Sequence, residues 1–154
     1  MLATGHKVTL DAAKITPAGH YTRRVDYQRV SSGSPFEATI GFSRAVRVGP
    51  WIAVSGTAPL DADGTTAHVG DVYGQTRCCI QIMVRAIEEA GGSIIDVIRT
   101  RIMLMDIRRW QEAAQAHGEF FGGIRPASTF VQVAGFIDPA WLVETEADCM
   151  VRCA

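Results

Sequence analysis

The sequence contains no long apolar run and no strong excess of one charge. Its uncharged apolar stretches are short, as at residues 102–105, whereas a membrane-spanning helix needs about 20 consecutive apolar residues. Fifteen Lys and Arg face sixteen Asp and Glu, so the formal net charge is −1. This balance gives no general attraction to phosphate backbones or anionic lipids. We therefore expect neither a membrane protein nor a dedicated nucleic-acid binder.

Cysteine is also scarce, and its spacing matches no metal motif. Cys78 and Cys79 are adjacent, while Cys149 and Cys153 form a C-x3-C pair, and no His lies beside them at zinc-ligand spacing. The N-terminus has no basic stretch followed by an apolar signal region. We expect reduced thiols, no metal and a cytoplasmic protein. The sequence leaves open whether Cys149 and Cys153 are reachable.

The chain has 154 residues, 47% of them hydrophobic, which is enough for one domain with a buried core. Residues 1–36 show no sustained helical or strand period, and we interpret them as an N-terminal extension. This extension could hold one short strand or helical turn, and the SSGSP segment at residues 31–35 is its linker. Residues 37–154 form the predicted folded domain.

Periodicity within this domain predicts the order ββαβαββ. Strands are expected at residues 43–48, 51–54, 97–105, 128–134 and 142–151, and helices at residues 79–90 and 108–121. The first two strands, separated by Gly49-Pro50, predict a β-hairpin. Paired glycines follow each helix and end its pattern. The order favours an α+β two-layer sandwich in which both helices cover one face of a mixed sheet.

The opposite face of this sheet has an unusual predicted composition. In the strand at 97–105, alternation places Ile98, Ile102 and Leu104 toward the helices and leaves arginines and methionines on the other side. The last strand contributes Leu142, Glu144, Glu146 and Asp148 to that same side. A face that mixes Met, Leu and charge is either hydrated or an oligomer interface. In the core we expect Trp51, Met83, Trp110 and Phe121.

No known catalytic or phosphate-binding motif is present, so individual side chains must be weighed. Ser55 ends an apolar strand before Gly56, where turn chemistry competes with a nucleophilic role. His117 lies on the apolar stripe of the second helix as either a core histidine or a general base. Glu144 is either a solvated acidic residue or, if partly desolvated at a subunit interface, a carboxyl whose raised pKa suits a general base. An arginine such as Arg101 could pair with it or bind a substrate carboxylate.

Five motifs in order carry a family resemblance. They are IGFSRAVRVGPWIAVSG from Ile40, GDVxxQT from Gly70, EAGGSIIDVIRTR from Glu89, FFGGIRPAST from Phe120 and VETEA from Val143. From about residue 40 to residue 154, the chain resembles the RidA/YjgF family of small proteins. The resemblance implies a chorismate-mutase-like fold, a homotrimer and a small-molecule pocket at each subunit interface. It also implies hydrolysis of reactive imines or enamines to 2-oxo acids and ammonia, with no cofactor.

The resemblance also assigns site residues, with one departure. In the deaminating members an Arg in a Pro-Ala-Arg motif binds the substrate carboxylate, and here Ser128 stands at that position. Phe42 stands where a Tyr is often found, whereas Gly56 and Glu144 match. We expect Glu144 to be catalytic and the substrate-binding residues to be Phe42, Ser55, Gly56, Arg101, Ser128 and Phe130. Arg101 is the expected replacement for the missing arginine.

Two functions from different classes follow. One is an altered imine or enamine hydrolase in which Glu144 positions water. The other is a trimer that binds a small metabolite without converting it. We expect this ligand to carry a carboxylate. RNA cleavage, sometimes attached to this family, would need paired acid and base histidines or a basic channel, and the sequence supplies neither.

Overall fold

The computed structural model describes residues 26–34 and 37–152. Residues 1–25 of the expected extension, residues 35 and 36 at its junction with the domain, and Cys153 lie outside the described residues. Everything that follows concerns the described part of the chain.

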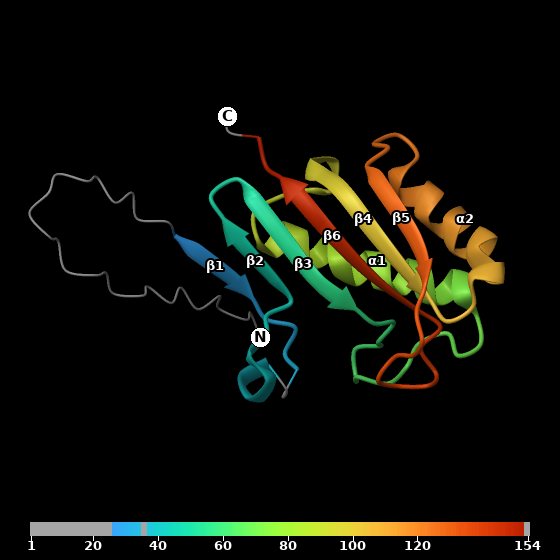
Figure 1. The fold of residues 1–154 in the computed structure, drawn as a ribbon. Coiled ribbons are helices and arrows are strands. Elements are labelled where there is room, and N and C mark those ends of the chain that lie inside the picture. The colour runs from blue at the N-terminus through green and yellow to red at the C-terminus, as the bar shows by residue number, and fades with distance from the viewer. Residues whose placement is uncertain (1–25, 35–36, 153–154) are drawn as a thin grey trace, which may run out of the picture.

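The structure is an α+β two-layer sandwich built on a mixed six-stranded sheet (Figure 1). The strands are β1 (Tyr27–Val30), β2 (Ala45–Val48), β3 (Trp51–Thr57), β4 (Val97–Leu104), β5 (Ala127–Gln132) and β6 (Val143–Met150). Their spatial order is β1-β2-β3-β6-β4-β5. Only β4 and β5 pair in parallel among these strands, and the other neighbours are antiparallel. The mixed sheet and the β2–β3 hairpin confirm the sequence prediction.

Two long helices, α1 (Val72–Glu89) and α2 (Trp110–Phe121), lie on the same side of the sheet, as predicted (Figure 1). Short turns of other helix types precede β2 at Glu37–Gly41, β4 at Ile94–Asp96 and α2 at Ile107–Arg109. Apolar residues at helical spacing on α1 face the sheet, and Ile80, Met83 and Ile87 are fully buried there. The alternate residues of β6 complete this core, which includes Ala147 and Cys149.

Both ends of α1 are capped by side chains. At the N-terminus the carboxylate of Asp71 accepts a hydrogen bond from the Gly74 backbone N–H. At the C-terminus the guanidinium of Arg47 donates to the carbonyls of Ala90 and Gly91. Gly91 has φ +75°, a conformation that favours glycine and ends the helix. These caps fix the position of α1 over β3 and β6.

The structure differs from the sequence prediction at the edges. Residues 27–30 pair with β2 as an additional edge strand, inside the range interpreted as an extension that could hold one short strand. Ile98 does not face the helices, because a register shift between Val97 and Arg99 turns Val97 inward and leaves Ile98 exposed. The expected core positions Trp51 and Trp110 are also wrong.

The two tryptophans are exposed for different reasons. Trp51 is 40% exposed because it lies on the open face of the sheet, paired across from Met150. Trp110 is 47% exposed and is the first residue of α2, whose buried positions begin one turn later at Ala113. Met83 and Phe121 are buried, as predicted.

No helix within residues 26–34 and 37–152 is long and apolar enough to cross a membrane. In the same described ranges, His, Cys, Asp and Glu side chains form no cluster of three that could hold a metal ion.

Candidate functional site

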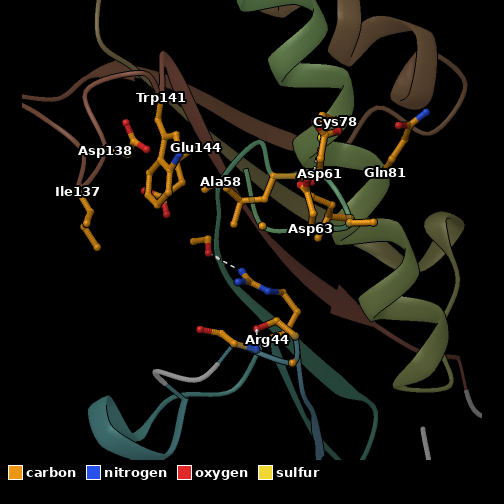
Figure 2. Close-up of a pocket in the computed structure, with 18 of the residues that line it drawn as sticks. Arg44, Ala58, Asp61, Asp63, Cys78, Gln81, Ile137, Asp138, Trp141 and Glu144 are labelled. Carbon is orange, nitrogen blue, oxygen red and sulfur yellow. Dashed lines mark hydrogen bonds between the residues drawn. The ribbon is translucent and has the colours of Figure 1, made fainter. Parts of the chain in front are cut away.

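A broad cavity of about 1260 Å³ opens at the end of the sheet where β3 stops and β6 starts. Its walls come from five segments, at residues 32–34, 40–44, 56–68, 78–85 and 137–144. Figure 2 shows Arg44 entering from one wall, Trp141 and Glu144 from another, and Cys78 and Gln81 from α1. Segments distant in sequence thus place acidic, basic and aromatic groups around one space.

Glu144 lies directly against Gly56 in this cavity. A Cβ atom added to Gly56 would stand 2.7 Å from Glu144 Oε1 and 3.2 Å from its Cδ. Only a residue without a side chain leaves the carboxylate this position. The match of Gly56 and Glu144 with the family pattern therefore has a direct steric basis.

The Glu144 carboxylate is half-buried and makes neither a hydrogen bond nor a salt bridge with the described residues. Burial raises the pKa of Glu144 above its ordinary value, and the neighbouring charge of Glu146 adds to that rise. The positive charge of Arg44 opposes it. An unpaired carboxylate with a raised pKa in a cavity has the properties of a general base.

Arg44 is held by the chain as it leaves β3. Its Nη1 donates to the Gly56 carbonyl at 2.5 Å, to Thr57 Oγ1 at 3.1 Å and to Ser55 Oγ at 3.2 Å. The Ser55 N–H in turn donates to the Arg44 carbonyl. This region coincides with the register shift between β3 and β6. The shift interrupts the regular ladder at Gly56, so its carbonyl can accept from the guanidinium beside the two hydroxyls.

The loops at the cavity entrance are tied together by Gln75 of α1, which is fully buried. Its amide donates to the carbonyls of Ala67 and Ala140 and accepts from the Leu142 N–H. The Trp141 indole N–H also donates to Thr66 on the opposite loop. These bonds hold the aromatic wall of the cavity beside Glu144.

The structure brings together only some of the residues expected from sequence. Phe42, Gly56 and Glu144 line the cavity, and the Ser55 hydroxyl lies beside it on Arg44. The Ser55 side chain also donates to the Arg44 carbonyl, which is the turn chemistry weighed above. One chain therefore places four of the seven expected residues at or beside the cavity.

Ser128 and Phe130 are elsewhere, on the edge strand β5. The Ser128 hydroxyl is bonded to Thr100 Oγ1 at 2.9 Å, and the same oxygen lies 2.9 Å from His117 Nε2. The His117 ring packs on Phe121 and, edge-on, on Phe130. Burial lowers the pKa of His117. His117 does not line the cavity of its own chain.

Arg101 does not line this cavity either. Its guanidinium lies on the open face of the sheet and forms ion pairs with Glu146 at 2.7 Å and Asp148 at 3.3 Å. The strand register explains this, because Arg101 is opposite Glu146 on β6. Its charge is already compensated within the chain.

Sequence reasoning missed three residues that build the site, namely Arg44, Gln75 and Trp141. A signal existed for two of them, since Arg44 and Gln75 lie within motifs quoted for the resemblance. Neither could be assigned to the cavity without knowing that the register shift at the end of β3 and the loop before β6 meet there.

Comparisons with known proteins agree with this architecture. Residues 32–151 match the family described as endoribonuclease L-PSP. An uncharacterized protein of Streptomyces coelicolor is 41% identical over 121 residues, covering 79% of this chain and 90% of that protein. A RutC family protein of Pyrococcus abyssi is 32% identical over 106 residues, covering 69% of this chain and 83% of its own.

A solved structure extends the likeness to the fold. A Mycobacterium tuberculosis member of the YjgF/YER057c/UK114 family aligns with TM-score 0.73 and 43% identity, covering 82% of this chain and all of that chain. Since the family match spans most of the sequence and the solved family member shares the fold, the chain belongs to the RidA/YjgF family, which is also described as endoribonuclease L-PSP.

Proposed function

We propose that this protein hydrolyses small reactive imines or enamines to a carbonyl compound and ammonia, with Glu144 as the general base. The observation that carries the proposal is the unpaired Glu144 carboxylate, whose pKa is raised by burial and which lies against Gly56 in the cavity. Such a carboxylate remains available to water or substrate because no group of the described chain occupies it.

The chemistry needs one water molecule and no redox step. An enamine first shifts a proton to carbon and becomes the imine. Glu144 accepts a proton from water as the water oxygen attacks the carbon of the C=N bond, and it then gives this proton to the nitrogen. In the resulting carbinolamine the hydroxyl proton passes to the nitrogen, the C–N bond breaks to release ammonia and the C–O bond becomes a carbonyl. Holding the base against Gly56 positions it for the attack, which is the geometric part of such catalysis.

The proposal includes a homotrimer whose subunits complete each pocket. Two features support it. The open face of the sheet exposes Trp51, Val131 and Met150, each about 40% exposed, beside the charged pairs of Arg101. Ser128 and Phe130 lie apart from Glu144 within one chain, so a neighbouring copy is needed to bring them to the same ligand. Native mass spectrometry of the full chain measures the assembly directly.

Binding without turnover is the second candidate, and Ser128 is the observation that favours it. A serine at the family's arginine position removes a charged contact to a substrate carboxylate, and its hydroxyl is already engaged with Thr100. Under this alternative the trimer retains a metabolite unchanged.

The experiment measures ammonia release from freshly generated 2-aminoacrylate. The proteins compared are the parent, Glu144→Gln and Ser128→Arg, each first shown to assemble alike. We expect activity in the parent and its loss in Glu144→Gln, since an amide cannot accept the proton. Activity in Ser128→Arg alone would support binding without turnover of this substrate in the parent. No activity in any folded protein would refute the hydrolase.

A further inference from the structure

We infer that Arg44 is the anion-binding residue of the cavity and holds the acidic group of the ligand opposite Glu144. This inference rests on the proposed small-molecule site and deepens it. It assigns ligand recognition to Arg44, the residue directly before β2, and not to Ser128 or Arg101.

The first argument is that only one of the three guanidinium nitrogens of Arg44 makes hydrogen bonds with the described residues. All three hydrogen bonds that Arg44 makes through its side chain use Nη1. These bonds fix the group in one orientation without neutralising it, because the acceptors are a carbonyl and two hydroxyls. Among the described residues, Nη2 has no hydrogen-bond or ion-pair partner, and Nε is buried without one.

A buried donor without a partner is uncommon and costly in native proteins. Here that donor belongs to a cation that lines a cavity. Burial lowers the pKa of Arg44, while the charges of Glu37 and Glu144 raise it, so the site disfavours an isolated charge and favours an added anion. A carboxylate beside Nη2, with a small shift that admits it to Nε, would satisfy both donors in the two-pronged geometry that guanidinium groups favour.

The second argument is the charge of the surroundings. Glu37 is already engaged, since its two carboxylate oxygens accept from Ser31 and Ser32. The acids of the lining that accept hydrogen bonds are Asp63, from Thr65, and Asp138, from Thr66 and Ala140. Asp61 and Glu144 also lie in the wall and add to its acidic character.

Among the described residues, the other basic side chains of the lining, Arg85 and His68, are exposed. An anion therefore finds a favourable position at Arg44, and the rest of the wall favours a neutral or N–H-bearing group. The ligand class that fits is a small molecule with one carboxylate beside a C=N or N–H group. Figure 2 shows the guanidinium directed toward the centre of the cavity, with Glu144 and Trp141 beyond it.

The experiment uses two stable probes of similar shape, 2-oxobutanoate and the neutral 2-oxobutanamide. Binding of each is measured by calorimetry to the full-length parent, Arg44→Gln, Arg44→Lys and Arg108→Gln. Arg108 is a matched control because it is an exposed arginine outside the cavity, paired with Asp106. All four proteins are first compared for assembly and thermal unfolding.

We expect the parent and Arg108→Gln to bind the acid about tenfold to a hundredfold more tightly than the amide, as a charge-assisted contact to a carboxylate provides. Arg44→Gln should lose that preference while still binding the amide. Arg44→Lys should keep part of it, since lysine keeps the charge but not the planar fork. A folded Arg44→Gln that keeps the full preference, or a parent that shows none, overturns the inference.

Because Arg44 also holds the end of β3, the glutamine variant could lose stability. We therefore add a measurement on the parent that does not depend on the stability of a variant. The Arg44 Nε–H resonance, assigned with the lysine variant, should shift on titration with 2-oxobutanoate and not with the amide. An unchanged resonance at saturating acid overturns the inference.

The two proposals fail in different ways. Ammonia release that survives in Arg44→Gln with unchanged KM would leave the hydrolase in place and remove Arg44 as the anchor. If acid binding depends on Arg44 but no substrate releases ammonia, the role of Arg44 as the anion-binding residue stands and the proposed hydrolase activity is refuted.

Discussion

Gly56→Ala should displace the Glu144 carboxylate while leaving the fold nearly as stable as the parent. The added Cβ would stand 2.7 Å from Glu144 Oε1, and real Cβ atoms do not approach other atoms within 3.0 Å. The carboxylate must therefore move by several tenths of an ångström. It lies at the end of a flexible side chain and has no partner to lose, so rotation relieves the contact.

The stability effect is small because two terms oppose each other. Gly56 has no positive φ, so alanine fits the backbone and restricts the unfolded chain, a gain of about 0.4–1 kcal/mol at compatible sites. Moving Glu144 uses up part of that gain. We expect the free energy of unfolding to change by less than about 1 kcal/mol.

The activity effect is larger, because a misplacement of about 1 Å at a reacting group costs on the order of a hundredfold in rate. For a smaller displacement we expect kcat/KM for ammonia release to fall about tenfold or more. The assays are steady-state kinetics, chemical denaturation and ¹³C NMR of the Glu144 carboxyl. The NMR pKa should rise, since the new methyl group adds to the burial that already raises the pKa of Glu144.

A second variant separates displacement from general damage. In Gly56→Ala with Glu144→Asp, the shorter acid removes the clash, so the Gly56 substitution should cost less in this background than in the parent. Parent-like kcat/KM in Gly56→Ala would refute the claim that the observed contact is the working geometry. A loss of several kcal/mol in stability would refute the claim that the carboxylate yields easily.

Three further predictions concern the scaffold. Burial lowers the pKa of His117, so the unfolded chain binds the His117 proton at a higher pH than the folded chain, and the parent loses stability as the pH falls below about 6.5. His117→Gln should weaken this pH dependence, which denaturation at several pH values measures. Arg47→Ala removes the guanidinium from the Ala90 and Gly91 carbonyls and should cost about 1 kcal/mol in unfolding free energy, and Arg47→Lys should restore part of it. Ile102→Ala, at a fully buried position of β4, should cost about 2–5 kcal/mol by denaturation, and a cost below 1 would contradict its place in the core.

Local chemistry determined much of this protein from sequence alone. The alternation of residues 143–150 placed Thr145, Ala147 and Cys149 inward and Glu144 outward, because successive side chains of a strand point to opposite faces. The apolar spacing of α1 and the glycines after it set the helix and its end. These features depend on near neighbours, which a sequence displays directly.

The contacts of the site were decided only by the tertiary structure. Arg101 and Arg44 are alike in the sequence, yet the strand register gives Arg101 two carboxylate partners on the open face and brings Arg44 into the cavity without any. The decisive feature is the register shift at the end of β3, which the alternation of the sequence does not reveal. The sequence by itself predicted the family, the two layers and the outward position of Glu144 on β6. Which arginine shares a cavity with Glu144 depends on how segments 100 residues apart pack, because long-range pairing, and not local preference, sets the positions of charges in space.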